Sequence, residues 1–447
     1  MPSESTPEDA QRRALSDAAL VASLFAAGCA LARIRGFDHV SDDDFARVTI
    51  AQAFAVAPKL DPSGTSWLPF PFWLLGTALR VAGRTLEAAR GASLVFASLA
   101  AAMPYVALRA VGVARKIALV ATLASLATPW ALWLGSATVP ESFTASAVTA
   151  AAIALGARSA PRGARIAGAL AIALACLSRY EAWPVAVVLA IALVARGVED
   201  RDRRVALPAL IAVAAPLAWM AWNAHAHGSP VHFLHRVASY RRAVGQGAGD
   251  VLPALLLYPK LLATTRPEVL VALVTTAPLL LRPHVRGRWG VALAAALAQI
   301  AFLAYGAAND GAPTHHAERA LLAPAQLSVV FAIESAWSAW SSSSARARAT
   351  LLVGTALAAA GALVSLRALG GPPPGSGEGE DRRAQIARGR ALASLPRLHV
   401  SPCSYEHFAL IAAYGAPERV VVATRPPELR APVTPDCPGI EEEPLPP

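Results

Sequence analysis

The chain is poor in charge. Asp, Glu, Lys and Arg make up 16% of its 447 residues, whereas a soluble domain carries roughly 25%. Hydrophobic residues account for 55%, and the mean hydropathy is +0.45. This shortage, with apolar runs recurring along the chain, argues against a soluble domain and predicts an all-α polytopic membrane protein.

Acidic residues are scarcer than basic ones, 30 against 40, and the net charge is +10. Such an excess can indicate nucleic-acid binding, but the Arg residues stand in short clusters between apolar runs. That is the positive-inside pattern of cytoplasmic loops. We therefore expect no nucleic-acid partner, a cytoplasmic N-terminus over 1–13, and about eleven spans that leave the C-terminus in the periplasm of a bacterial inner membrane.

The spans are expected in a transmembrane domain covering 14–366. They are the apolar runs 14–34, 91–109, 117–135, 142–157, 165–178, 182–196, 206–222, 267–282, 289–306, 320–338 and 349–366. The first outside connection, 35–90, contains an amphipathic stretch at 42–57 and an aromatic one at 67–76. Both are expected to lie at the membrane interface.

Cysteine is rare, with four residues in the chain. Cys29 and Cys176 lie in apolar runs and are expected to be buried thiols. Cys403 and Cys437 lie in a polar tail, where they can pair if that tail faces an oxidising compartment. The tail follows a Gly- and Pro-rich linker at 367–385.

Residues 386–447 are expected to form a small periplasmic α/β module. The hydropathy of the chain drops after about residue 367, and the pattern predicts strands at 398–400 and 419–423 around a helix at 405–414. A module of this size holds only a small core, so a Cys403–Cys437 disulfide would stabilise it.

Against the scarcity of acid, four carboxylates lie within seven residues after the first span: Asp38, Asp42, Asp43 and Asp44. An exposed acidic cluster is often a solvated turn or a helix N-cap. The functional interpretation is that one Asp deprotonates or orients an acceptor hydroxyl or amine at the membrane surface. Several acids together also permit a divalent metal, whereas the spacing of the histidines matches no standard zinc pattern.

The order of these elements resembles the GT-C glycosyltransferases, in particular the protein mannosyltransferase and aminoarabinose transferase branch. The resemblance rests on the acidic pair, the interfacial stretch, the Trp and Pro residues of 65–69 and an Arg before the second span. The segments 178–182 and 316–324 match further short motifs. The chain departs from the family in having Asp-Asp in place of Asp-Glu, and Leu68-Pro69-Phe70-Pro71 in place of Lys-Pro-Pro.

The resemblance implies a glycosyltransferase that moves a sugar from a polyprenyl-phosphate donor to a lipid, glycan or protein acceptor, with membrane lipid as a further partner. The catalytic carboxylate would be Asp43 or Asp44, with Asp42 as a near substitute and Asp38 as a structural residue. The residues expected to hold the donor phosphate are Arg179, Arg319, Arg90 and Arg84. The residues expected to line the acceptor cleft are Trp67, Tyr180, Glu181 and His316.

Two other functions stay open. One is a transporter or flippase for envelope lipid precursors, and the other is a GT-C-like assembly protein without catalysis. A transporter should carry ionisable or Gly/Pro-broken segments at mid-span depth, whereas here the charged residues fall mainly at span ends. Arg179 and Glu181 also have a structural alternative, an ion pair that anchors the span ends.

Overall fold

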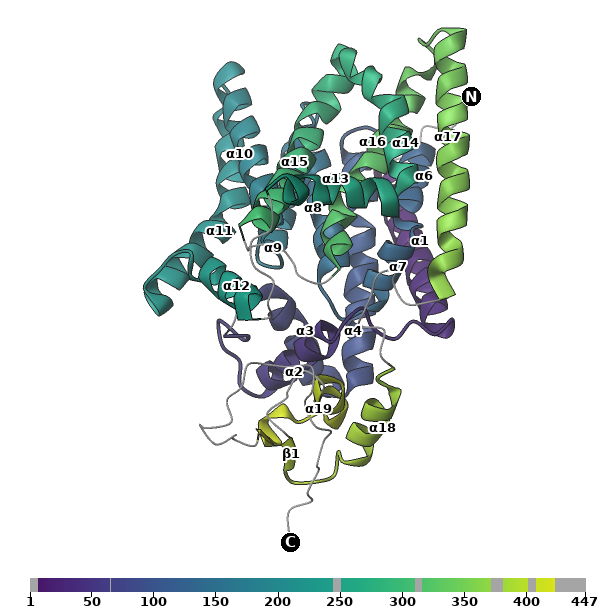
Figure 1. Cartoon of the computed structure of the whole chain (residues 1–447). Helices are drawn as coiled ribbons and strands as arrows, with labels where there is room; N and C mark the ends of the chain where they lie inside the picture. Colours follow the sequence, from purple (N-terminus) through teal and green to yellow (C-terminus); the bar gives the residue numbers. More distant parts are fainter. Residues whose placement is uncertain are drawn as a thin grey trace.

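The computed structural model describes residues 7–64, 66–243, 251–309, 316–370, 381–400 and 407–422. These residues are mainly helical, with one parallel pair of short strands. Figure 1 shows the long helices side by side in one bundle, with the last elements of the chain below it. Cys29 and Cys176 are buried free thiols, as expected, whereas Cys403 and Cys437 lie outside the described residues.

The helices follow the apolar runs of the sequence. The first half contains α1 (Pro7–Ile34), α2 (Asp43–Val56), α3 (Phe70–Ala82), α4 (Leu86–Ala101), α5 (Met103–Ala110), α6 (Arg115–Leu126), α7 (Pro129–Ser136), α8 (Glu141–Gly156), α9 (Arg162–Cys176), α10 (Ala182–Glu199) and α11 (Ala206–His227). The second half contains α12 (His232–Ala243), α13 (Val251–Thr265), α14 (Pro267–Thr276), α15 (Pro283–Ala308), α16 (Leu322–Trp340), α17 (Ala345–Leu366), α18 (Arg383–Ala391) and α19 (Phe408–Tyr414).

Short 3-10 turns and two strands complete the chain. The turns are η1 (Arg203–Val205), η2 (Ala277–Leu281), η3 (Ala317–Leu321), η4 (Arg367–Gly370) and η6 (Pro417–Arg419). Strands β1 (Leu398–Val400) and β2 (Val420–Val422) pair in parallel.

Seven helices of the described chain are long and apolar enough to cross a membrane, or eight if the bent pair α6–α7 is one span. The chain is therefore built as a multi-pass membrane protein. Three other expected spans, 142–157, 165–178 and 267–282, coincide with α8, α9 and α14, which are not among these candidates. The expected total of eleven spans is thus not confirmed.

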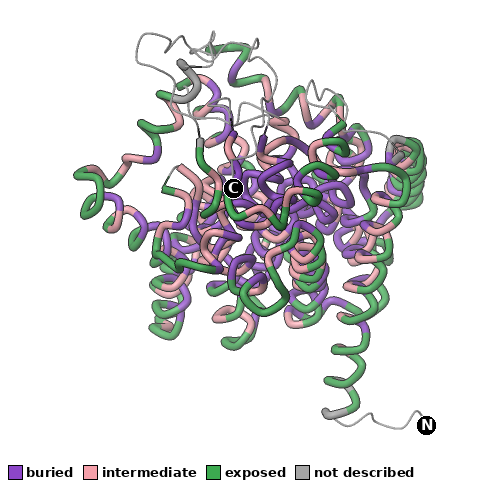
Figure 2. Tube along the Cα trace, turned by 90° about the horizontal axis from the view of Figure 1, so that it is seen from below, coloured by how far each residue is buried: buried purple, intermediate pink, exposed green. Residues whose placement is uncertain are grey.

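Helix α8 lies at the centre of the bundle. Every residue of α8 except Phe143 is buried, and Figure 2 shows buried chain concentrated in the middle of the molecule. The sequence of α8 is rich in Ala, Ser and Thr, and small residues let helix backbones approach closely. A Cβ added to Gly168 of α9 would lie 2.9 Å from Ala154 of α8, so this crossing requires glycine.

A break between α6 and α7 turns the chain by 75°. Thr128 caps α7 by accepting a hydrogen bond from the Ala131 N–H, and Pro129 occupies the first helical position. This bend carries the connection 137–140 from α7 to α8 toward α2, where Thr138 bonds to Asp44.

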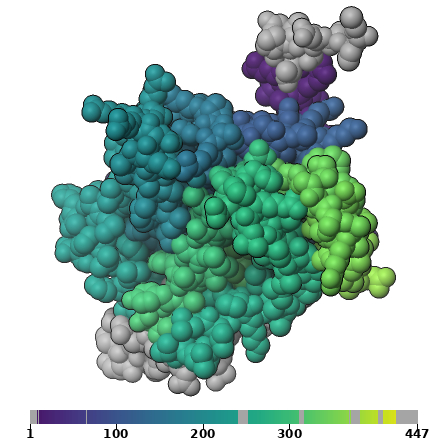
Figure 3. Space-filling model, turned by 90° about the horizontal axis from the view of Figure 1, so that it is seen from above, coloured from purple at the N-terminus to yellow at the C-terminus, as the bar shows by residue number. Residues whose placement is uncertain are grey.

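The α2 end of the molecule also contains the C-terminal elements. The strands and the helix expected there occur as β1, β2 and α19. However, α18 and α19 share a hydrophobic core with α2, α3 and α4, so a separate module is not confirmed. At the other side of the bundle, the N-terminal part of the chain (purple) projects beyond its neighbours in Figure 3.

Candidate active site

The acidic loop between α1 and α2 is held from both sides. Asp38 pairs with Arg90 of α4 at 2.6 Å and with His39 at 3.4 Å. Although burial alone would raise the pKa of Asp38, the hydrogen bond with His39 and the charge of Arg90 bring it down to about 2. Asp38 therefore fixes the loop on α4, and Arg90 is occupied by this contact.

Asp44 ties the start of α2 to the bundle. One carboxylate oxygen accepts hydrogen bonds from the N–H groups of Val40 and Ser41 at 3.1 and 3.3 Å, and the other accepts one from Thr138 at 3.0 Å. Burial raises the pKa of Asp44, whereas nearby His39 and these N–H groups favour its ionised form. The side chain is 3% exposed, so its oxygens hold the loop rather than face an open site.

Asp42 and Asp43 point to different partners. Asp42 accepts two hydrogen bonds from Arg382, at 3.0 and 2.8 Å. Asp43 lies 3.3 Å from Arg319 of η3. The Asp43 side chain is 35% exposed, against 22% for Asp42. Of the three consecutive aspartates, Asp43 is therefore the most accessible to a substrate.

Asp43 belongs to a set of six charged residues that we call the arginine cluster. It consists of Asp43, Arg47, Glu141, Arg179, Glu181 and Arg319. Its members come from the start of α2, the first residue of α8, the α9–α10 connection and η3. Elements far apart in the chain thus meet at one end of the bundle.

Two carboxylates hold Arg179 in this cluster. Arg179 lies 2.6 Å from Glu141 and also donates to Glu181. Burial lowers the pKa of Arg179, but Glu141 and Glu181 outweigh that effect and leave it above its usual value. Glu141 is shared, because Arg319 lies 3.7 Å from the same oxygen.

Arg47 stands apart within the cluster. It is 5% exposed, yet no carboxylate lies within ion-pair distance of it and its Nε makes no hydrogen bond among the described residues. Burial lowers its pKa, and Arg179 and Arg319 act in the same direction, against Glu141 and Asp43. Its guanidinium lies over the Trp67 ring at 4.3 Å. The arrangement would favour a bound anion.

Neither Arg47 nor Glu141 was predicted as a site residue. Arg47 follows Asp43 by four positions, which places both on one face of α2, and this spacing is a signal that could have found it. Glu141 opens an apolar helix, where the helix dipole favours a carboxylate. A third buried group, Arg266, donates to the Thr128 hydroxyl at 3.1 Å, and burial lowers its pKa to about 10.

The other predicted site residues are divided. Glu181 is a member of the arginine cluster, and Trp67 contacts it through Arg47. Tyr180 stacks on Phe233 of α12 with ring centroids 4.2 Å apart, and His316 packs near Trp130 at 6.1 Å. Arg84 lies away from this group, because it pairs with Glu418 at 2.8 Å.

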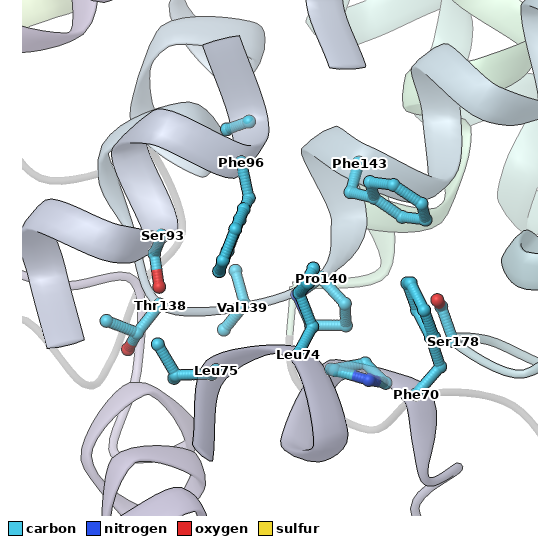
Figure 4. A pocket seen from close by; sticks show the side chains of 12 residues that line it. Phe70, Leu74, Leu75, Ser93, Phe96, Thr138, Val139, Pro140, Phe143 and Ser178 are labelled. Atoms are coloured by element: carbon cyan, nitrogen blue, oxygen red, sulfur yellow. The ribbon is translucent and has the colours of Figure 1, made fainter. Parts of the chain in front are cut away.

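Figure 4 shows an apolar cavity whose lining includes the chain neighbours of two cluster residues. Phe70, Phe96 and Phe143 line it together with Pro140 and Ser178, which precede Glu141 and Arg179 in the chain. Its volume is about 50 Å³, which is room for a few water molecules and not for a sugar. The cavity is therefore too small to be the substrate pocket.

Among the described residues, no group of three or more His, Cys, Asp or Glu side chains is arranged to hold a metal ion. The carboxylates of the arginine cluster are instead interleaved with guanidinium groups. With all six side chains ionised, three positive and three negative charges balance.

Solved structures provide one point of comparison. The chain is similar to ArnT from Cupriavidus metallidurans bound to undecaprenyl phosphate, with a TM-score of 0.49 and 17% identity over 88% of this chain and 74% of that one. It is similar to the apo state of ArnT with a TM-score of 0.46, 16% identity and the same coverage. ArnT is a GT-C glycosyltransferase, the superfamily that the sequence motifs resemble.

No protein-family model matches the chain, and no curated protein does.

Proposed function

We propose that the chain is a membrane glycosyltransferase. It would transfer a sugar from a polyprenyl-phosphate donor to a lipid, glycan or protein acceptor on the periplasmic face of the inner membrane. The observation that carries the proposal is the arginine cluster, in which a partly exposed carboxylate stands beside buried guanidinium groups. A base next to an anion site is what transfer from a phosphate-linked sugar requires.

Asp43 is the proposed base. It is the most exposed of the three consecutive aspartates, and its carboxylate lies 3.3 Å from Arg319. Asp44 would hold the first turn of α2 in place, since both of its oxygens accept hydrogen bonds from the loop and the bundle. This narrows the expected pair to one base and one supporting residue.

Arg47 is the proposed primary ligand of the donor phosphate. Arg179 and Arg319 already face carboxylates, whereas Arg47 has none within ion-pair distance among the described residues. A phosphate would give Arg47 a directly bound anion through charge-assisted hydrogen bonds. Arg179 and Arg319 would then strengthen the positive field around the departing phosphate.

The proposed reaction is a single displacement. Asp43 takes the proton of the acceptor hydroxyl or amine, and the acceptor atom forms a bond to the anomeric carbon. The bond from that carbon to the lipid-phosphate oxygen breaks, and its electron pair stays on the phosphate. Attack opposite the phosphate inverts the anomeric centre. The guanidinium groups stabilise the charge that develops on the leaving oxygen.

Arg90 and Arg84 take structural roles in this proposal. Arg90 is engaged by Asp38 and Arg84 by Glu418, so neither is offered to the donor. Trp67, Tyr180, Glu181 and His316 remain proposed for the acceptor side of the site. The proposal keeps a cytoplasmic N-terminus, because the basic connections then share one face.

The proposal is tested by mass spectrometry of envelope glycans, glycolipids and glycoproteins in a deletion strain. A sugar missing from the deletion strain should return with the wild-type gene and stay absent with Asp43→Asn. Loss of a general base costs on the order of 10²–10⁴-fold, so the product should fall at least ~100-fold while the protein still accumulates in the membrane.

The matched control is Asp61→Asn. Asp61 lies in the same connection, where its carboxylate accepts hydrogen bonds from Ser63 and Gly64 within a turn. This variant should restore the product. Full restoration by Asp43→Asn would sink the proposed function.

A further inference from the structure

The C-terminal segment, residues 381–400 and 407–422, packs on the helix that carries the proposed base. Ile386 of α18 and Ala412 of α19 share a hydrophobic core with Phe45, Val48 and Ala51 of α2. Figure 1 shows α18 and α19 beside α2 and α3, although they are some 340 residues later in the chain. The segment is therefore part of the wall behind the proposed site.

A buried glutamine fastens this packing. Gln52 of α2 is fully buried, and its side-chain amide donates to the backbone oxygens of Arg84 and Ala412 at 2.7 and 2.8 Å. Both amide protons are thus used. One bond reaches the α3–α4 connection and the other reaches α19, so α2 cannot slide without breaking a buried hydrogen bond.

Arg382 reaches the first turn of α2. Asp42 occupies the N-cap position of α2, where an Asp side chain commonly accepts a hydrogen bond from the helix backbone. Here Asp42 makes no such cap bond. Its two oxygens instead face Arg382, at 3.0 and 2.8 Å. The Arg382 side chain is only 9% exposed, so this two-pronged contact is screened from solvent.

The first turn of α2 is consequently gripped from two directions. Asp44 fixes it to the bundle through Thr138, and Asp42 fixes it to the C-terminal segment through Arg382. Asp43 lies between them and faces Arg319. Neighbouring helical side chains are about 100° apart around the helix axis. The contacts of Asp42 and Asp44 therefore set the direction in which Asp43 points, and rotation of this turn would move its carboxylate.

We propose that Arg382 is a positioning residue for the transfer reaction. By holding Asp42, it keeps the Asp43 carboxylate aimed at Arg319 and the acceptor, so the C-terminal segment completes the active site. This inference rests on the proposed function, in which Asp43 is the base. Without Arg382, the Asp42 carboxylate is released to cap its own helix and the first turn rotates.

Other ion pairs join the same two parts of the chain and supply matched controls. Arg390 of α18 pairs with Glu87 of α4, and Glu418 pairs with Arg84. Both pairs attach the C-terminal segment, yet neither contacts the first turn of α2. If the segment only supported the fold, the loss of each pair would lower the product only as far as it lowers the amount of folded protein.

The experiment uses the full chain in the deletion strain, with product measured by mass spectrometry. Misplacing a reacting group by about 1 Å costs on the order of 10²-fold, so Arg382→Gln should lower the product ~10- to 100-fold. Arg382→Lys, which keeps the charge, should recover part of it. Arg390→Gln and Glu418→Gln should stay within about twofold of wild type, as for exposed ion pairs.

A double-mutant cycle tests the route of the effect. Asp42→Asn should lower the product about as far as Arg382→Gln, and the two together should lower it no further, because the residues act as one unit. Binding of undecaprenyl phosphate to the purified protein, followed by native mass spectrometry, should change less than about threefold in Arg382→Gln. That probe reports the arginines and not the base.

The outcomes separate the two proposals. If Arg382→Gln keeps full product while Asp43→Asn loses it, the positioning role is wrong and the proposed function stands. The positioning role is equally overturned if Arg390→Gln loses as much product as Arg382→Gln, or if Arg382→Gln loses undecaprenyl phosphate binding in step with product. If Asp43→Asn keeps full product, the proposed function itself fails.

Discussion

Two buried carboxylates outside the arginine cluster, Asp17 and Glu334, bind their donors differently from the carboxylates within it. We call each of these two carboxylates, with its donors, a structural cluster. Toward the N-terminal end of α1, both oxygens of Asp17 are taken: Tyr105 donates at 2.5 Å and Arg115 donates twice at 2.7 Å. Glu334 of α16 is likewise held by Arg288 and by the Trp289 indole. Each of these carboxylates has one arginine and one neutral donor.

In the arginine cluster near α2, the carboxylates and the arginines are not paired one to one. Glu141 serves both Arg179 and Arg319, while its second oxygen makes no hydrogen bond among the described residues. Arg47 is buried and has no carboxylate within ion-pair distance in the same part of the chain. Leaving a buried charge without its counter-ion costs several kcal/mol. A structural cluster avoids that cost, whereas a binding site recovers it when the ligand arrives.

The largest effect is expected from the replacement of Arg47, and it concerns the affinity for undecaprenyl phosphate. Arg47→Met keeps an apolar side chain against Trp67 and removes the buried charge. Each hydrogen bond to a charged group contributes about 1.5–3 kcal/mol, so the affinity for undecaprenyl phosphate should fall on the order of 10²-fold. The melting temperature should stay the same or rise, because the variant no longer buries an unpaired charge. Native mass spectrometry and thermal melts of purified protein provide the two measurements.

The contrary result for Arg47 is equally specific. If Arg47→Met unfolds at clearly lower temperature and binds undecaprenyl phosphate as wild type does, Arg47 belongs with the structural clusters. Its cation–π contact with Trp67 at 4.3 Å would then be its main contribution. The arginine cluster would then have a structural role as well.

The structural cluster of Asp17 should show the opposite pattern. Asp17→Ala leaves the fully buried Tyr105 hydroxyl without its acceptor, and an unsatisfied buried donor costs about 2 kcal/mol. The melting temperature should therefore fall by several degrees, while undecaprenyl phosphate binding per folded molecule should not change. Tyr105→Phe is the matched control, since it removes the donor and leaves Asp17 paired with Arg115. If Asp17→Ala lost undecaprenyl phosphate binding without losing stability, Asp17 would not have the structural role assigned to it here.

The local sequence predicts where the helices lie in the chain, but it does not predict how they pack against one another. Apolar runs place α1, α10, α11 and α15 because each run is long and bounded by polar residues. They do not foresee that every residue of α8 except Phe143 is buried, since alanine-rich segments are only weakly apolar. Nor do they foresee that the tail packs on α2, because an apolar residue such as Ile386 does not name its partner.

The candidate site shows the same limit. Asp43, Arg179 and Arg319 were expected from motifs in local sequence, and the structure brings them near Glu141. Arg47 and Arg382 were missed, since their meaning lies in what surrounds them. Arg47 matters because no carboxylate among the described residues lies within ion-pair distance of it, and Arg382 because it meets Asp42 across 340 positions. Pairing over such separations is a property of the fold and has no local pattern to reveal it.

The smallest effect is expected from breaking an exposed ion pair that has the same length as a buried one. Arg158 lies 2.6 Å from Glu199, the same separation as Arg179 from Glu141. However, the side chains of the first pair are 53% and 60% exposed, against 12% and 2% in the second. Water and salt screen the exposed pair, so Arg158→Ala should change stability by less than about 1 kcal/mol. Melting curves at low and high salt would show this difference shrinking as salt is added. If Arg158→Ala instead costs as much stability as Asp17→Ala, distance alone sets the strength of ion pairs in this protein. The difference between the structural clusters and the arginine cluster would then not be due to burial.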